Sequence, residues 1–198
     1  MRKLLFNVSM AAAMIAAPIA SHAEVPSGNG DLFVSGSVGQ SHTDVAGLTN
    51  KNDTAYGLNF GYRYNDTWGL ETGYVDLGKP EANGNIDGYD YKAKLHVSGW
   101  TVGGNGKFNF AQHWFVSGRL GIFFSSTKLT ESLAGSGSDQ IKTNDVNWYA
   151  GVGAGYNFNR HLSLSINYDR YTAKAKTILT NTNSPHMLSG TLEYRFGV

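Results

Sequence analysis

Hydrophobic and polar residues alternate with a period of two along most of the chain after residue 30. From Tyr56 to Tyr64 the even positions are aromatic or aliphatic, and the odd positions are Gly, Asn and Arg. Successive side chains of a strand point to opposite faces, so this alternation predicts a strand with one apolar face. The same division recurs in seven other segments, at about residues 32–39, 68–74, 100–110, 114–125, 148–158, 162–169 and 188–196. The pattern predicts an all-β chain of eight strands.

The connections between these segments alternate between short and long. Three are three-residue turns, at 65–67, 111–113 and 159–161. Between them lie long polar stretches, at about 41–52, 77–93, 127–144 and 172–186. Short turns at one end and long loops at the other are typical of a transmembrane barrel, with the short turns and both termini on the periplasmic side. We therefore predict an eight-stranded antiparallel up-and-down β-barrel in the bacterial outer membrane.

The apolar face of these strands carries nearly all the large side chains. The opposite face is mainly Gly, Ser, Asn and Thr with isolated charges. A soluble, lipocalin-like barrel would turn the apolar face inward, but an eight-stranded interior is just wide enough for side chains to fill. The apolar face is therefore expected to point outward into lipid, around a polar, filled lumen.

Closure and register follow from this orientation. An open edge in hydrocarbon leaves backbone groups unpaired at several kcal/mol each, so the first strand must pair with the last. A slip of the last strand by one residue would move Glu193 and Arg195 into lipid, where a basic group costs about 2–4 kcal/mol near the midplane.

The N-terminal segment has the features of a secretory signal. Arg2 and Lys3 precede an apolar stretch from Leu4 to Ala20, which small residues follow up to Ala23. This predicts a signal peptide over residues 1–23 and a mature barrel over residues 24–198. An uncleaved anchor helix is the alternative, although Asn7 and Pro18 interrupt the stretch.

Composition narrows the function classes further. The chain has no cysteine, so an exported protein of this size must hold together without disulfides. Residues 24–198 carry 14 Lys and Arg against 15 Asp and Glu, a net charge of −1. This balance indicates neither a basic surface that would bind nucleic acid nor a polybasic patch that would bind a membrane.

The predicted lumen contains seven charged side chains. They are Arg63, Glu71, Lys107, Arg119, Asp169, Glu193 and Arg195. Buried charges must pair or stay hydrated, and a three-residue turn places Glu71 diagonal to Arg63, within reach of it. We interpret the set as a network that plugs the barrel. The alternative is a gated ion path, which would show discrete conductance steps in planar bilayers that change in Arg119→Ala.

Aromatic residues gather near the expected membrane interfaces. They form predicted girdles. The periplasmic members are Tyr64, Trp68, Phe110, Trp114 and Phe158, and the outer members are Tyr74, Trp100, Trp148 and Tyr168.

No motif assembles a convincing reactive site. His161-Leu-Ser163 is similar to a motif of lipid A deacylase barrels, but it lies in a periplasmic turn without an apparent acidic partner. The six histidines have no metal-ligand spacing. The sequence therefore predicts no catalytic residues, no metal and no cofactor.

The last strand and two inner segments resemble a known family. Residues 186–198, with Tyr-Arg-Phe near the end, resemble the closing strand of OmpA-like outer-membrane barrels, and residues 68–78 and 148–158 are similar to their third and sixth strands. The resemblance implies that Tyr194 and Phe196 are read by the barrel assembly machinery, although this chain ends in Gly197-Val198. Many relatives continue into a peptidoglycan-binding domain; wall anchoring is not expected here.

These features predict a non-catalytic barrel that supports envelope integrity among outer-membrane lipids and lipopolysaccharide. One alternative is an adhesin whose loops bind a host or phage surface. The others are a narrow ion-conducting pore and a lipid-modifying enzyme. The loops offer aromatic and basic contact groups, namely Tyr89, Tyr91, Lys92, Lys94, Lys174 and Lys176.

Overall fold

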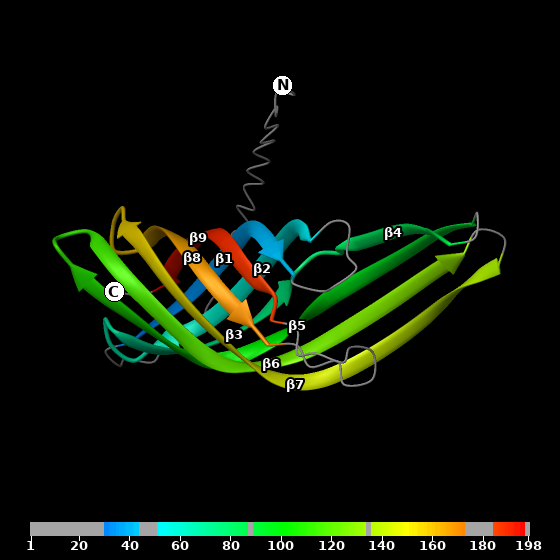
Figure 1. Ribbon diagram of the computed structural model, residues 1–198. Helices are drawn as coiled ribbons and strands as arrows, with labels where there is room; N and C mark the ends of the chain where they lie inside the picture. The colour runs from blue at the N-terminus through cyan, green and yellow to red at the C-terminus, as the bar shows by residue number, and fades with distance from the viewer. Residues whose placement is uncertain (1–29, 44–50, 87–88, 134–135, 173–183, 197–198) are drawn as a thin grey trace, which may run out of the picture.

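The computed structural model describes residues 30–43, 51–86, 89–133, 136–172 and 184–196, and these residues form nine strands (Figure 1). The strands are β1 (Asp31–His42), β2 (Asn52–Arg63), β3 (Trp68–Asp76), β4 (Glu81–Ile86), β5 (Tyr89–Phe110), β6 (Trp114–Leu133), β7 (Ser136–Asn157), β8 (Leu162–Tyr171) and β9 (His186–Phe196). Within these ranges, no helix is both long enough and apolar enough to cross a membrane.

Eight of the strands close into an antiparallel barrel. The sheet runs β3-β2-β1-β9-β8-β7-β6-β5, and a further β3–β5 pairing joins its ends. The first and last strands pair with Val34 opposite Tyr194 and Leu32 opposite Phe196, as closure required. The predicted register of the β2–β3 hairpin, at the first short turn, is also confirmed, because Glu71 lies opposite Gly61 and therefore diagonal to Arg63. The expected fold class, an eight-stranded up-and-down barrel, is confirmed.

Two of the stretches expected to be polar loops are instead largely strand. The stretch 77–93 contains β4, which pairs with the start of β5 from Glu81 opposite Lys94 to Ile86 opposite Tyr89. The stretch 127–144 is the outer part of the β6–β7 hairpin. Both loop predictions were wrong. The alternation of apolar and polar residues marks only the strand segments that contact lipid, so strands outside the membrane lack it. A ladder that continues into water on both faces keeps its hydrogen bonds without that signal.

As a result, β5, β6 and β7, with β4 paired to the outer part of β5, project well beyond the other strands at the end opposite the short turns (Figure 1). The contact residues Tyr89, Tyr91, Lys92 and Lys94, expected in a loop, belong to β5.

The short turns are fixed by local hydrogen bonds. In the first, the Asn65 side-chain oxygen accepts from the backbone N–H of Thr67 at 2.9 Å and of Trp68 at 2.8 Å. Asn159 does the same for His161 and Leu162, both at 2.8 Å. An asparagine that bonds to the backbone two and three residues later folds the chain back on itself. Both turns therefore have the same sequence-encoded geometry.

The two faces of the wall differ as the alternation predicts. Outward-facing Leu, Ile, Val and aromatic side chains are about half exposed, such as Ile166 at 68% and Leu120 at 63%. Inward-facing groups such as Ser163 and Asn167 are buried. The large apolar surface therefore lies on the outside of the barrel, as a lipid-facing wall requires.

Candidate functional site in the barrel lumen

All seven charged residues predicted for the lumen lie on the inward face. Asp169, Lys107, Arg63 and Glu71 are the most buried, with exposed fractions of 0%, 1%, 5% and 8%. The others are partly buried. They come from six strands, since each strand of a closed sheet sends every second side chain inward. The structure divides them into two groups.

The first group centres on the Glu193 carboxylate, toward the short-turn end. Two nitrogens of the Arg63 guanidinium donate to Glu193 Oε1 at 2.8 Å and Oε2 at 2.9 Å, a bidentate pair. Lys107 Nζ donates to Glu193 Oε1 at 3.2 Å and to the Ser163 hydroxyl at 3.0 Å. Arg195 Nε lies 3.6 Å from the same carboxylate oxygen. One carboxylate therefore joins three cations from β2, β5 and β9.

Aromatic rings support two of these cations. The Arg63 guanidinium carbon lies 4.5 Å from the centre of the Phe33 ring, and Lys107 Nζ lies 3.9 Å from the centre of the Phe115 ring. A cation over a ring face is attracted by the ring quadrupole, and the attraction grows when water is excluded. The rings of Phe33 and Phe115 therefore stabilise the two cations as well as filling the lumen.

The second group lies deeper along the barrel. Asp169 accepts two hydrogen bonds from Arg119, one of them from Nε at 2.5 Å. Glu71 accepts from the Asn105 amide and from the Tyr149 hydroxyl, each at 3.0 Å. The Tyr149 bond links β7 to β3 across the lumen.

The expected Arg63–Glu71 pair is not among the ion pairs of the described residues. Arg63 bonds to Glu193, two strands away around the sheet, whereas Glu71 bonds to Asn105 and Tyr149. Strand register places Glu71 near Arg63, but it does not reveal contacts that cross the lumen. Such contacts depend on barrel curvature, which local spacing does not specify.

An apolar layer fills the lumen beyond the charged groups, so the filled interior is less polar than expected. Its members are all less than 5% exposed. They are Ala55, Val75, Leu77, Val97, Phe123, Tyr149, Tyr171 and Met187. The Tyr149 ring packs beside the Tyr171 ring and lies over the paired glycines Gly103 and Gly121, where a methyl group would collide with it.

These inward aromatics were detectable in the sequence. Phe115 and Phe123 occupy the same parity on β6 as Arg119, which the sequence places in the lumen. Strict parity would have placed them inside. Their apolar character instead suggests the lipid-facing side, and this hides their inward position.

The space left in the lumen is small. A cavity of about 50 Å³ lies between the charged groups, lined among others by Arg63, Glu71, Asn105 and Arg119. That volume accommodates roughly three or four water molecules. The buried Arg63 Nε and Asn105 Oδ1 have no hydrogen-bond partner among the described residues. A donor and an acceptor beside a polar cavity are suited to bound water. A wider, open hollow of about 540 Å³ lies at the short-turn end.

The arrangement does not create an evident nucleophile. Ser163 Oγ accepts a hydrogen bond from Lys107 Nζ at 3.0 Å and donates one to Glu193 Oε1 at 3.4 Å, so this hydroxyl is already engaged within the charge cluster. His161 donates from Nδ1 to the Arg195 carbonyl at 3.1 Å and its ring stacks on Tyr194. Among the described residues, no group of three or more His, Cys, Asp or Glu could hold a metal ion.

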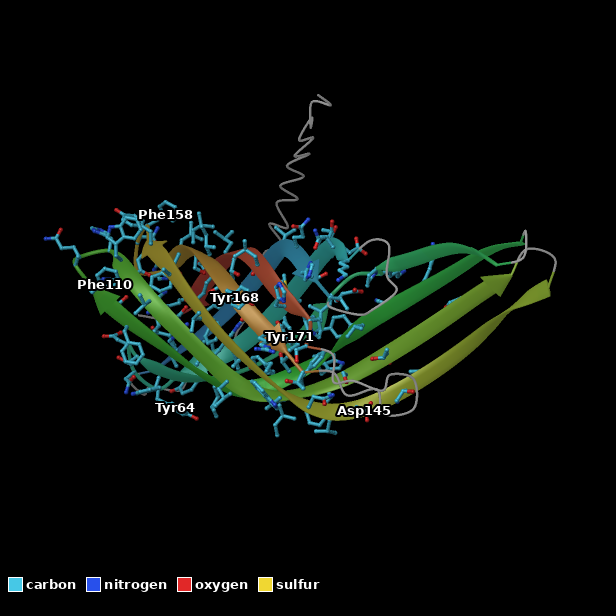
Figure 2. The ribbon with its side chains drawn as sticks, viewed as in Figure 1. Tyr64, Phe110, Asp145, Phe158, Tyr168 and Tyr171 are labelled. Atoms are coloured by element: carbon cyan, nitrogen blue, oxygen red, sulfur yellow. The ribbon has the colours of Figure 1, made fainter. Side chains whose placement is uncertain are left out.

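The aromatic residues assigned to the girdles lie on the strands or, for Tyr64 and Phe158, directly after the end of a strand. All of the proposed girdle residues are at least 40% exposed. Tyr64, Phe110 and Phe158 lie at the short-turn end, and Tyr168 lies further along the barrel (Figure 2). Tyr194 and Phe196 also face outward, with their rings 4.8 Å apart. Their roles as interface anchors and as an assembly signal remain predictions.

Three sequence-based assignments fall outside the described residues. They are the signal peptide over 1–23, the C-terminal Gly197-Val198, and the contact residues Lys174 and Lys176.

Comparison with known proteins gives the family. The model of the outer membrane protein beta-barrel domain family matches residues 9–196. No curated protein matches the chain.

Three of the solved structures similar to this chain are bacterial proteins. The attachment invasion locus protein Ail of Yersinia pestis, solved in complex with the heparin analogue sucrose octasulfate, is 18% identical with a TM-score of 0.54, covering 85% of this chain and 99% of its own. Neisserial surface protein A is 14% identical with a TM-score of 0.53, covering 83% and 97%. The N-terminal barrel domain of Pseudomonas aeruginosa OprF is 13% identical with a TM-score of 0.53, covering 85% and 98%. At these low identities, the likeness shows a shared fold and nothing about a shared role.

Proposed function

This chain belongs to the outer membrane protein beta-barrel domain family, and from that premise we propose that it is a non-catalytic structural barrel that supports the integrity of the outer membrane. The observation that carries this proposal is that the charged side chains of the lumen pair with one another. Arg63, Lys107 and Glu193 bond to one another, and Arg119 bonds to Asp169. Groups that are paired with each other in this way stabilise a wall and are poorly placed to act on a substrate.

The apolar layer gives a second reason to favour a plug over a pore. Phe123, Tyr149 and Tyr171 are nearly fully buried at the outer end of the lumen, and an ion crossing there would lose its hydration without gaining ligands. We therefore expect no conductance steps in planar bilayers, either from the wild-type barrel or from the Arg119→Ala variant. Discrete conductance steps from verified single insertions would contradict this part of the proposal.

The role in integrity is tested by deletion and complementation. A strain lacking the protein is expected to become more sensitive to bile salts or detergent, and the wild-type gene restores resistance. A variant whose β4–β5 and β6–β7 extensions are replaced by short turns separates the barrel from its outer part, and it is expected to restore resistance as well. An unchanged deletion strain would refute the proposal.

Surface binding is the second candidate, favoured by the projection of β5, β6 and β7 beyond the barrel (Figure 1). Strands held by a rigid barrel position contact groups well away from the membrane. The Yersinia pestis barrel of this fold is by name an attachment protein and was solved with a heparin analogue. The short-turn variant above discriminates the two roles, because it loses adhesion to host cells while keeping membrane robustness.

A further inference from the structure

The projecting part of β5, β6 and β7 carries basic residues on its lipid-facing side. Trp100, Phe124 and Val146 form an exposed row across the three strands, in register with one another. Four residues further out on the same face, the strands place His96, Lys128 and Lys142 side by side. Lys128 and Lys142 are exposed, and the residues between them and the Phe124 row keep the alternation of the strand.

Lys128 and Lys142 lie directly opposite each other in the β6–β7 ladder. Like charges facing each other across two strands are unfavourable, because their Cβ atoms are about 5 Å apart. Within the part of the chain that the structure describes, neither lysine forms an ion pair. An anion that bonds to both ammonium groups would turn this repulsion into attraction.

The surrounding charges leave this position basic. The neighbouring His96 is bonded to the Asp76 carboxylate at 3.0 Å, so that acid already has a partner. Asp145 lies on the same part of β7 (Figure 2) but has the opposite parity, and so faces the other side of the sheet. Lys94 is exposed on the same face, one row further out than the lysine pair, but it lies opposite Glu81 in the β4–β5 ladder, so the basic charge at this position comes from Lys128 and Lys142.

The height of the pair above the membrane fits a lipid headgroup. Four residues of strand span about 13 Å, and a strand tilt of about 40° reduces this to about 10 Å along the membrane normal. Flexible lysine side chains reach back several ångströms toward the bilayer. The ammonium groups therefore reach the polar layer just outside the hydrocarbon, where the headgroup phosphates lie.

We propose that Lys128 and Lys142 form a binding site for a phosphate group of an outer-leaflet lipid, held against the lipid-facing side of the β6–β7 hairpin. The outer-leaflet lipid with phosphates at this depth is lipopolysaccharide, through its lipid A. The site needs the outer-membrane location and the strand register, and it does not depend on a role in envelope integrity.

The test is native mass spectrometry of the folded barrel in a neutral detergent, titrated with lipid A carrying its phosphates and with dephosphorylated lipid A. Wild type is expected to bind the phosphorylated form more tightly. A lysine near an anionic lipid surface contributes about fivefold to binding, so Lys128→Gln with Lys142→Gln is expected to lose about 25-fold. Both proteins bind the dephosphorylated form equally. The proposal would be overturned if the wild type bound phosphorylated and dephosphorylated lipid A equally well. It would also be overturned if the double variant still preferred the phosphorylated form.

Two control variants separate the site from general effects. Lys51→Gln with Arg160→Gln removes the same charge from exposed positions elsewhere and is expected to bind like wild type. Lys142→Glu places opposite charges across the ladder, so it keeps or improves hairpin stability while losing the phosphate preference. Loss of binding in the first control would show a net-charge effect and contradict the site.

A competition arm identifies the source of the phosphate. Excess inorganic phosphate is expected to displace little lipid A, because the acyl chains hold the headgroup at the wall. Displacement by inorganic phosphate at equal concentration would show a free-anion site and overturn the assignment to lipid.

Discussion

Removing the Glu193 carboxylate tests the charge cluster in the lumen most sharply. Glu193→Gln leaves the cations of Arg63, Lys107 and Arg195 close together without the carboxylate that joins them. Removing one partner of a buried ion pair costs about 3–5 kcal/mol, because it leaves uncompensated charge. We expect a loss of that size in the free energy of unfolding.

A double-mutant cycle distinguishes this mechanism from a simple loss of hydrogen bonds. Lys107→Met keeps most of the side-chain volume against Phe115 and leaves Glu193 bonded to Arg63, so alone it is expected to cost about 1–2 kcal/mol. In the Glu193→Gln background the same change relieves repulsion. The double variant is therefore expected to be about 2 kcal/mol more stable than the sum of the single effects predicts.

The assay is urea unfolding of the barrel in phosphatidylcholine vesicles, followed by tryptophan fluorescence and by the different gel mobility of folded and boiled protein. High salt is expected to change the result little, since buried pairs are poorly screened. If the two substitutions add to within about 0.5 kcal/mol, the carboxylate does not hold the cations together and the reasoning is refuted.

Three further predictions address the wall and its packing. Gly73→Ala is expected to destabilise the barrel, because the new methyl group collides with Asn59 and the Leu58 carbonyl; Gly36→Ala, which meets nothing within 4 Å, is the control, and equal unfolding midpoints would contradict the packing. Ala111 has a φ of 43°, so Ala111→Gly is expected to stabilise the turn by about 1 kcal/mol in urea unfolding, and a loss of stability would count against strain there. Phe123→Ala removes a fully buried ring from the apolar layer, with an expected cost of about 3–5 kcal/mol by the same measurement; a cost below about 1 kcal/mol would mean that the layer is not packed.

The sequence predicts the barrel wall well because one physical constraint governs it. Outward residues such as Leu164 and Leu192 must meet lipid, and the alternation this demands identifies the strands, the short turns and the closure of β1 on β9. Register then follows, since a slip by one residue exchanges the two faces.

Beyond the membrane the same reasoning fails. The outer parts of β5, β6 and β7 lie outside the hydrocarbon, so polar residues such as Thr143 and Asn144 are as suitable there as apolar ones and the pattern disappears. The ladder hydrogen bonds that hold these strands leave no periodic signature in side-chain polarity.

Contacts inside the lumen were the least predictable part. The position of each charge on the inward face followed from parity, but its partner did not. Arg63 and Glu193 are 130 residues apart, and Glu71 and Tyr149 are 78 apart. Which groups meet depends on the barrel's curvature and on the volume of rings such as Phe33, and neither is visible in local spacing.

The account depends on which face of the wall meets lipid, and labelling from the lipid phase measures this directly. A hydrophobic photoprobe dissolved in vesicles containing the folded barrel is expected to modify Leu164 and Tyr156 on the outward face. Ser165 and Asn157, their neighbours on the lumen face, should be left unmodified. Labelling of Ser165 and Asn157 with protection of Leu164 and Tyr156 would contradict the orientation and, with it, the plugged lumen and the lipid site.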